Sequence, residues 1–369
     1  MTMTSRENVW ATLRFEGPEW IPRETWMLPW ANLHLPETVA AIRERYPDDL
    51  GWAPPVYKPS PRRKGTPFTV GSYVDEWGCI FENAHEGIHG QVKNPILVDL
   101  NDWKAVVQPP VETLPDDRQE ARDIANRGCA ESHLFIRGGG CPRPWERYQF
   151  LRGTEEAMVD IMFPEDGFHD VIKRIHDFYL REIEFWVSTD IDGIFFMDDW
   201  GSQSALLIPP PIWRTLFKPL YKDYCDLAHA NGKAVFMHSD GYIQEIYPDL
   251  VEIGIDALNS QLFVMDMEVL ASVAKGKMTF WGEMDRQHVL PAKDPQVGRQ
   301  AVRKAAKHLY DPSGGIMAQF ELSPGSNAAT ALAVHDEWEK VHAEARSSEI
   351  SSDQKKKVVN MIREVSHDE

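Results

Sequence analysis

Apolar and polar positions follow two alternating patterns along the second half of the chain, starting near residue 130. Short apolar runs, typical of buried strands, are separated by longer stretches with apolar residues every three or four positions, typical of amphipathic helices. The predicted strands are residues 133–137, 193–197, 233–237, 255–258, 278–281 and 315–320. The predicted helices are residues 168–187, 211–230, 243–253, 266–274 and 294–309. This regular alternation predicts an α/β fold built on a parallel sheet.

A closed barrel and an open doubly wound sheet both satisfy this alternation. No GxGxxG or GxxxxGK[ST] segment precedes a predicted helix, which weakens the case for a nucleotide-binding open sheet. The first 130 residues are rich in Pro and Trp, and Pro54-Pro55 disfavours long helices there. We expect residues 1–130 to form a cap over the barrel mouth together with the first barrel elements, with a hairpin strand over 73–81. One domain is expected over residues 1–346, followed by a polar tail or helix over 347–369.

Charge and cysteine content narrow the possible partners and the compartment. The 369 residues carry a formal net charge of −18, which argues against nucleic acid or an anionic membrane as the main partner. The four cysteines form no CxxC pair, and the N-terminus has no hydrophobic signal region. No apolar run approaches the roughly 18 residues that a membrane-spanning helix needs. We therefore expect a cytoplasmic protein that binds a small molecule.

Polar residues follow five consecutive predicted strands, and the C-terminal ends of strands are where α/β barrels place their catalytic groups. The predicted catalytic residues are Asp198, Asp199, Asn259 and Glu283. Other roles are open at this stage: Asp198 and Asp199 could cap turns or helices, and Glu283 could be a structural partner of Arg286. Gly138-Gly139-Gly140, after the predicted strand over residues 133–137, indicates either a tight turn or a close approach to a ligand.

Imidazole and carboxylate groups at the same strand ends form a possible metal site. The predicted ligands are His238, Asp240, Glu283 and Glu321. These nitrogen and oxygen ligands suit Zn²⁺ and other first-row ions. Their spacing matches no local motif such as HExxH, so the prediction depends on their placement at strand ends. A core role for His238 and an ion pair for Glu321 are the alternatives.

Longer segments around these strand ends occur in a fixed order. They are Asp199-Trp200-Gly201-Ser202-Gln203, Phe236-Met237-His238-Ser239-Asp240-Gly241, residues 248–259, Phe280-Trp281-Gly282-Glu283-Met284-Asp285 and Ser323-Pro324-Gly325-Ser326. In order and spacing, from about residue 165 to 345, the chain resembles the uroporphyrinogen decarboxylase superfamily. The resemblance implies a (β/α)8 TIM barrel. It also implies either a tetrapyrrole decarboxylase or a methyltransferase that moves methyl groups to or from cobalamin proteins.

The N-terminal loop departs from the pattern of the decarboxylases. Those enzymes carry an arginine-rich loop that binds substrate carboxylates, whereas residues 23–32 here are aromatic and keep only Arg23. A substrate with eight carboxylates needs dense positive charge, so this chain is not expected to be a true uroporphyrinogen decarboxylase. An apolar or aromatic substrate fits better. The predicted substrate-binding residues are Trp26, Trp30, Trp200, Gln203, Gln261 and Arg286.

The metal ligands also depart from the family pattern. Thiol methyltransferases of the superfamily bind zinc through a His-x-Cys pair and a later Cys, and the matching positions here resemble His238, Asp240 and Ser326. The imidazole is kept and both sulfurs are absent. A harder site, with Glu283 or Glu321 replacing a lost ligand, suits activation of a methyl group bound to oxygen.

The leading hypothesis is a corrinoid-linked methyltransferase that demethylates a small methoxylated or similar compound with the help of a divalent metal, zinc being expected. The chain has no recognisable cobalamin-binding domain, so the methyl-accepting cobalamin would be carried by a partner protein. The alternative is a decarboxylase or other lyase for a smaller acid, for which the available arginines are Arg23, Arg137, Arg143, Arg147 and Arg286. A non-enzymatic barrel is disfavoured by the five polar strand ends. The chain is expected to be a monomer or homodimer.

Overall fold

Eight parallel strands form the central sheet of the protein, seen here in a computed structural model that describes residues 2–365. They are β1 (Arg23–Met27), β2 (Leu50–Trp52), β6 (Phe135–Arg137), β7 (Gly193–Met197), β8 (Ala234–Ser239), β9 (Ala257–Ser260), β10 (Thr279–Trp281) and β11 (Ile316–Leu322). Their order is β1-β11-β10-β9-β8-β7-β6-β2. The backbone N–H of Asp49 donates to the carbonyl of Arg23 at 2.9 Å, which links the two edge strands. The predicted (β/α)8 TIM barrel is confirmed.

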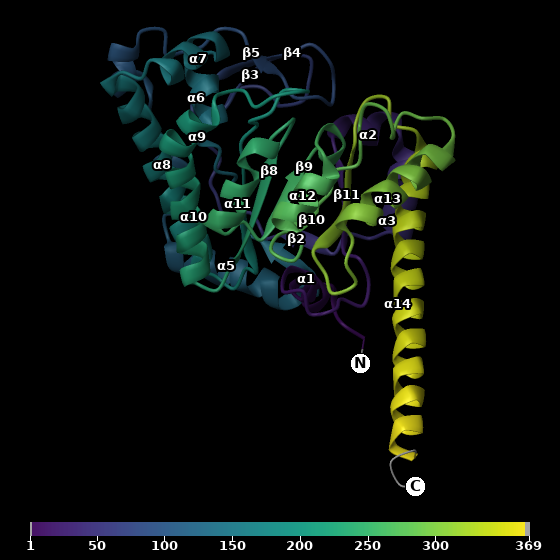
Figure 1. Ribbon diagram of the computed structural model, residues 1–369. Coiled ribbons are helices and arrows are strands. Elements are labelled where there is room, and N and C mark those ends of the chain that lie inside the picture. The colour runs from purple at the N-terminus through teal and green to yellow at the C-terminus, as the bar shows by residue number, and fades with distance from the viewer. Residues whose placement is uncertain (1, 366–369) are drawn as a thin grey trace.

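Helices surround this sheet (Figure 1). Their bounds are α1 (Ser5–Leu13), α2 (Pro29–His34), α3 (Pro36–Arg45), α4 (Trp103–Val106), α5 (Arg118–Glu131), α6 (Pro144–Arg152), α7 (Thr154–Met162), α8 (Asp166–Val187), α9 (Pro210–Leu216), α10 (Lys218–Ala230), α11 (Tyr247–Ile253), α12 (Met267–Ala274), α13 (Pro295–Leu309) and α14 (Ala328–Val365). Helix α8 shows why the predictions succeeded in this half. Its apolar residues recur at helical spacing and are buried, as Val171, Ile175 and Phe178 are.

Alternate residues along the strands fill the inside of the barrel. Phe135, Phe195, Phe236, Trp281 and Met317 belong to one buried cluster, although they come from five different strands. Residues of opposite parity, such as Phe196 and Met237, belong to the outer cluster that packs under the helices. This two-residue period is what a strand imposes on its side chains, and it decides which polar residues at the strand ends face the barrel axis.

The N-terminal residues do not all cover the mouth, which corrects part of the predicted cap. Val9 and Leu13 of α1 belong to the interior cluster of the barrel, and the N–H of Arg6 donates to the carbonyl of His133, just before β6. Helix α1 therefore closes the end of the barrel opposite the strand carboxyl ends, and it lies low in Figure 1, far from the β3–β5 sheet. The sequence could not show this, because an apolar helix face packs equally well against either end.

A small antiparallel sheet supplies the predicted hairpin. It contains β3 (Gly71–Val74), β4 (Ile80–Asn83) and β5 (Gln91–Val92), with Tyr73 paired to Phe81. The turn between β3 and β4 is held by Asp75, whose carboxylate accepts the N–H groups of Trp77 and Cys79 at 3.0 and 2.8 Å. This sheet lies beside α6 and α7 at the top of Figure 1.

The C-terminal helix α14 runs without a break from Ala328 to Val365. The predicted boundary between residues 346 and 347 therefore lies inside one helix, and residues 366–369 lie outside the described part of the chain. Its first turns pack against α13 and the barrel wall, where His335 Nε2 lies 3.0 Å from Thr25 Oγ1 of β1. Within residues 2–365, no helix has the length and apolar composition needed to cross a bilayer.

Candidate active site

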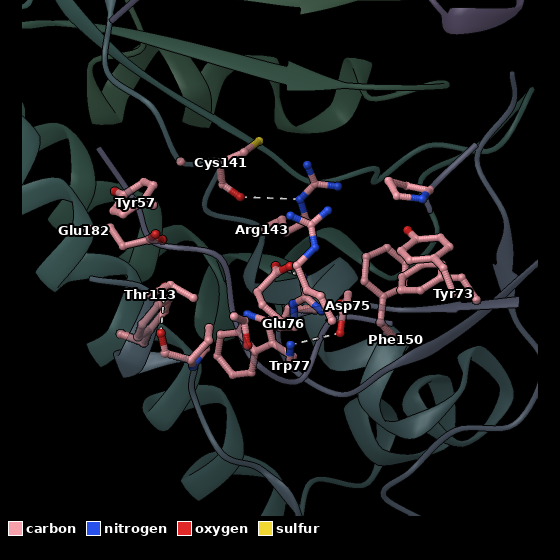
Figure 2. A pocket seen from close by; sticks show the side chains of 18 of the residues that line it. Tyr57, Tyr73, Asp75, Glu76, Trp77, Thr113, Cys141, Arg143, Phe150 and Glu182 are labelled. Carbon is pink, nitrogen blue, oxygen red and sulfur yellow. Dashed lines mark hydrogen bonds and ion pairs between the residues drawn. The ribbon is translucent and has the colours of Figure 1, made fainter. Parts of the chain in front are cut away.

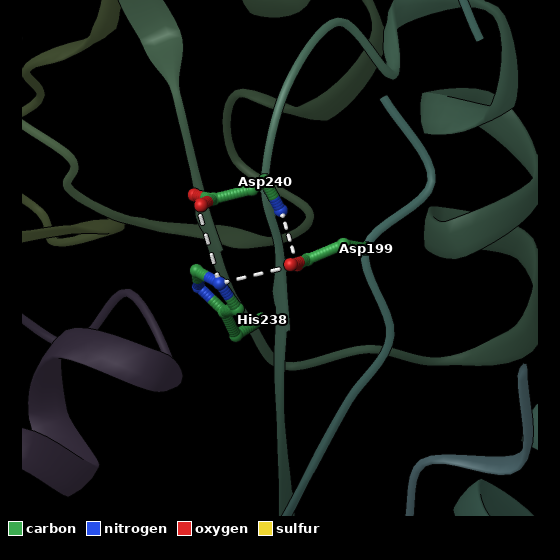
Figure 3. A group of neighbouring side chains, drawn as sticks. All are labelled: Asp199, His238 and Asp240. Carbon is green, nitrogen blue, oxygen red and sulfur yellow. Dashed lines mark hydrogen bonds and ion pairs between the residues drawn. The ribbon is translucent and has the colours of Figure 1, made fainter. Parts of the chain in front are cut away.

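Three ionisable side chains meet at the carboxyl ends of β7 and β8. His238 Nε2 lies 3.5 Å from an oxygen of Asp199 and 3.6 Å from an oxygen of Asp240. Figure 3 shows both carboxylates facing the same imidazole ring. The N–H of Asp240 also donates to Asp199 Oδ1 at 2.9 Å, which fixes the two loops relative to each other. His238 is buried, whereas both aspartates are partly exposed.

Asn259 of β9 determines which nitrogen of His238 faces the aspartates. The amide NH2 of Asn259 donates to the carbonyl of Trp281 and to Gln319 Oε1, so its oxygen is the atom that faces His238 Nδ1. An amide oxygen can only accept, so Nδ1 carries a hydrogen. The second nitrogen, Nε2, is therefore the atom available for a proton or a metal ion. Asn259 was predicted to be catalytic, and its position gives it an orienting role.

The two aspartates make His238 strongly basic. Burial alone would lower the pKa of His238, but the hydrogen bond with Asp199 and the charges of Asp240 and Asp199 outweigh it and raise the pKa to about 10. Burial likewise opposes ionisation of Asp199, yet its interaction with His238 holds the pKa of that carboxyl below its ordinary value. A positive charge is therefore favoured at Nε2, whether a proton or a cation supplies it.

Arg286 accounts for the other predicted metal ligands. Its guanidinium contacts Glu283 at 2.8 Å, Glu321 at 3.1 Å and Asp240 at 2.6 Å. Glu283 and Glu321 therefore form ion pairs with Arg286 and are not part of the group around His238. This arrangement supports the ion-pair alternative for both glutamates and revises the predicted ligand set. Burial raises the pKa of Glu283 to about 8, and Arg286 partly offsets that effect.

Asp198 and Trp200 are corrections to the predicted site. The carboxylate of Asp198 accepts the N–H groups of Trp145 and Glu146 at 2.9 and 2.7 Å and the hydroxyl of Tyr221 at 2.7 Å. It therefore holds the start of α6, as its alternative role as a cap implied. Trp200 is fully buried and donates to Tyr221 at 2.8 Å, so it belongs to the core under the helices. The parity of Asp198 matches Phe196, and both point away from the barrel axis.

The remaining predicted substrate-binding residues are scattered. Trp26 packs against the ring of His238 at a centroid distance of 5.2 Å, and Gln261 donates to Asp240 at 3.0 Å, so both lie at the triad. Trp30 lies on α2 and stacks on His34. Gln203 is exposed in the loop after β7.

Sequence reasoning missed Glu146, which lies beside the triad on the segment after β6, and it named the neighbouring Arg143 only as a carboxylate-binding residue of the alternative lyase. Burial raises the pKa of Glu146, and the charges of Asp199 and His238 also act on it, which places it near them. Glu146 Oε2 is buried without a hydrogen-bond partner among the described residues, and the guanidinium of Arg143 lies 3.8 Å away. The available signal was Gly138-Gly139-Gly140, since this loop ends the sixth strand of the chain at the same edge of the barrel.

The residues around His238 fit a divalent metal ion. A nitrogen and two carboxylate oxygens are a ligand set that Zn²⁺ accepts, and the three ligand atoms lie within 4.8 Å of one another. Two ligands bound to the same zinc ion at about 2.0–2.2 Å lie about 3.4 Å apart in tetrahedral geometry, close to the spacing seen here.

A closed parallel barrel with ionisable groups at the carboxyl ends of its strands defines the class of protein, a (β/α)8-barrel with the site position typical of enzymes. Residues 75–340 match the family described as uroporphyrinogen decarboxylase (URO-D). The chain belongs to this family. No curated protein sequence is significantly similar to the chain.

Two solved structures show how far the likeness extends. A methyltransferase from Methanosarcina mazei aligns over 92% of this chain and 99% of that chain, with a TM-score of 0.64 and 14% identity, so the two share a fold. The dihydropteroate synthase of Xanthomonas albilineans with 4-aminobenzoic acid aligns over 46% of this chain and 60% of that chain, with a TM-score of 0.28 and 12% identity, which is a weak likeness.

Proposed function

We propose that the protein is a corrinoid-linked methyltransferase that removes a methyl group from a small methoxylated or similar substrate with the help of a divalent metal ion. The observation that carries the proposal is the group of Asp199, His238 and Asp240, with Nε2 of His238 turned toward the two carboxylates. Membership in the URO-D family and a fold shared with a methyltransferase support it. A cobalamin on a partner protein would accept the methyl group.

Each residue of the site has a defined task in this reaction. Asp199, His238 and Asp240 would hold the ion, and Asn259 keeps the imidazole in the required tautomer. When bound, such an ion supplies Lewis acidity toward an ether oxygen. Trp26, against the ring of His238, provides an apolar wall for the substrate.

The leaving oxygen needs a proton, and in this proposal Glu283 would be its donor. Breaking the methyl carbon–oxygen bond would leave the electron pair on oxygen, and a reduced corrinoid would supply the nucleophile for the methyl group, so one proton would be consumed per transfer. Burial raises the pKa of Glu283 to about 8, and Arg286 partly offsets this, so the carboxyl would exchange a proton near neutral pH. Its Oε2 is buried and has no hydrogen-bond partner among the described residues.

A lyase acting on a small carboxylic acid is the second candidate, and Arg143 is the observation that favours it. Among the other arginines considered, Arg137 binds Glu24, Arg147 binds Asp75, and Arg286 binds three carboxylates. Arg143 alone of this set has no close carboxylate, the nearest contact being 3.8 Å to Glu146. One such arginine can hold one carboxylate, whereas uroporphyrinogen carries eight.

Metal analysis combined with two anaerobic assays tests the proposal. Protein purified with zinc supplied should contain about one ion per chain, and should methylate free cob(I)alamin with a methoxylated aromatic donor. Glu283→Gln should keep the ion and slow transfer by about 10²–10⁴-fold, the usual contribution of a general acid. Stepwise decarboxylation of uroporphyrinogen at enzymatic rates, or a metal-free protein, would contradict the proposal.

A further inference from the structure

A cavity whose lining includes none of the three triad residues lies between the small antiparallel sheet and helices α6 and α8. Its volume is about 440 Å³, within the range of roughly 300–1,000 Å³ that small-molecule sites occupy. Its walls come from segments far apart in sequence: residues 57–81, the loop at residues 140–143, and α8. Figure 2 shows Tyr57 and Glu182 on one side, Tyr73 and Phe150 on the other, and Arg143 between them.

Aromatic rings that pack against one another form part of the cavity wall. Tyr73 stacks on Phe81 with a centroid distance of 4.8 Å, and Phe81 in turn packs edge-on against Phe150 at 5.1 Å. Trp77 packs edge-on against Phe178 at 5.3 Å. Rings that hold one another in place present fixed faces and edges, which suit a planar aromatic ligand better than a flexible chain.

Four Lys and Arg side chains line the cavity: Arg63 is exposed at its edge, Lys58 pairs with Asp116 at 2.6 Å, and the other two are Arg147 and Arg143. Arg147 is neutralised by Asp75, with which it forms a close ion pair, and by Glu76 at 3.7 Å. Arg143 has weaker contacts: Nε donates to the Cys141 carbonyl at 3.4 Å, and a terminal nitrogen lies 3.8 Å from Glu146. Its side chain is 25% exposed and lines the cavity. A guanidinium has five N–H donors, and among the described residues most of those of Arg143 have no protein acceptor, so they can bind a ligand.

The opposite wall carries a neutral polar pair instead of a second anion. The indole N–H of Trp186 donates to Tyr57 Oη at 2.6 Å, and Tyr57 in turn hydrogen-bonds with Glu182. Burial and the charge of Glu76 raise the pKa of Glu182 to about 8, so at neutral pH this carboxyl does not repel an anion. Gly140 passes directly over the pair, where a Cβ would lie 3.4 Å from Tyr57 Oη.

We propose that this cavity is a binding site for an aromatic carboxylate, whose ring lies among Tyr73, Trp77 and Phe150 and whose carboxylate is held by Arg143. The inference does not depend on the proposed methyl transfer, because it concerns binding in the absence of metal and corrinoid. Arg–carboxylate pairs are charge-assisted and often bidentate, which explains a preference for a planar acid over a neutral analogue.

Equilibrium binding to the full chain tests the inference. Isothermal titration with 3,4-dimethoxybenzoate is expected to show one site, with at least tenfold weaker binding of the uncharged 3,4-dimethoxybenzamide. Cyclohexanecarboxylate should bind at least threefold more weakly than benzoate if the rings contribute stacking. Quenching of tryptophan fluorescence gives a second readout, since Trp77 lines the cavity.

Matched variants identify the cation. Arg143→Gln should weaken binding of the acid at least tenfold and remove the preference over the amide, whereas Arg143→Lys should restore part of it. Arg181→Gln removes the same charge from an exposed position beside Glu182 on α8 and should change affinity less than twofold. Equal binding of acid and amide, unchanged binding by Arg143→Gln, or no binding at millimolar concentration would overturn the inference. Loss of methyl transfer with binding intact would count only against the proposed function.

Discussion

Two clusters of carboxylates lie side by side at the barrel mouth, and they differ in where their positive charge comes from. Around Arg286, the carboxylates of Asp240, Glu283 and Glu321 surround a guanidinium that belongs to the chain. Around His238, Asp199 and Asp240 face a nitrogen that is positive only when it carries a proton or a metal ion. The first cluster has a permanent cation and the second an exchangeable one. Carboxylates that look equivalent in the sequence therefore have different chemistry.

The largest expected effect comes from removing His238, the side chain that carries the exchangeable positive charge. His238→Ala leaves Asp199 and Asp240 without their nitrogen partner, so zinc content should fall from about one ion per chain to near zero and methyl transfer should become undetectable. Elemental analysis and the cob(I)alamin assay measure the two effects. His288→Ala, at an exposed histidine that contacts Asp285, is the control and should retain both. Full metal content in His238→Ala would show that the ion does not bind at the triad.

Removing the permanent cation should act mainly on stability. Arg286→Gln leaves three carboxylates facing one another, two of them largely buried, and we expect a loss of about 3 kcal/mol in the free energy of unfolding. Added divalent cation should recover part of this loss, because the cluster then lacks its own cation. Urea denaturation with and without zinc measures both. Arg303→Gln breaks more exposed ion pairs with Glu337 and Glu344 and should cost less than about 1 kcal/mol.

The orienting amide should have a smaller effect on metal binding. Asn259→Leu removes the acceptor for His238 Nδ1 and the donor to the Trp281 carbonyl, and metal affinity should fall by about 10–100-fold. Competition with a chelator measures the affinity. Asn231→Leu, which removes an exposed amide bonded to the Leu227 carbonyl, is the matched control. An unchanged affinity would show that Asn259 does not fix the tautomer.

The smallest expected effect is the pH dependence of metal affinity and stability at His238, which Arg286 does not share. Because the pKa of His238 is raised to about 10, a metal ion must displace a proton, and affinity should rise about tenfold per pH unit up to that value. In metal-free protein the same raised pKa contributes stability that is complete below about pH 6.5 and is lost as the pH rises toward 10. Chelator competition and denaturation between pH 6 and 10 test both trends. A flat affinity profile would mean that Nε2 is not protonated in the free protein.

Much of the fold was predictable, because strands and helices impose different periods on the apolar residues. The strands β7 and β8 and helix α8 were visible for that reason. The strands β1 and β2 were not assigned individually. The first contains Arg23 and Glu24 among its five residues, and the second has only three residues and precedes Pro54. Neither has the long apolar run by which a buried strand is recognised.

The site was predictable only in part. Residues were assigned to it because they follow a strand, without asking whether the two-residue period of the strand turns each side chain toward or away from the barrel axis. His238 and Asn259 have the inward parity of Phe236 and Ala257, whereas Asp198 has the outward parity of Phe196. The two-residue period of a strand would therefore have separated His238 and Asn259 from Asp198. The contact between Arg286 and Glu321 joins two different βα units, so the sequence alone left Glu321 with an unidentified partner.

Helix α1 also constrains the order of events in the proposed reaction. With Val9 and Leu13 packed against the interior cluster, the far end of the barrel is closed, so the site is reached from the end at which the strand carboxyl ends lie. In the proposed reaction, substrate, demethylated product and the corrinoid of the partner protein would all enter and leave the site from that end. A docked partner therefore blocks exchange of small molecules, so product has to leave only after the partner has gone. A large excess of corrinoid protein should then slow turnover instead of speeding it, as expected for inhibition by a partner that blocks product release.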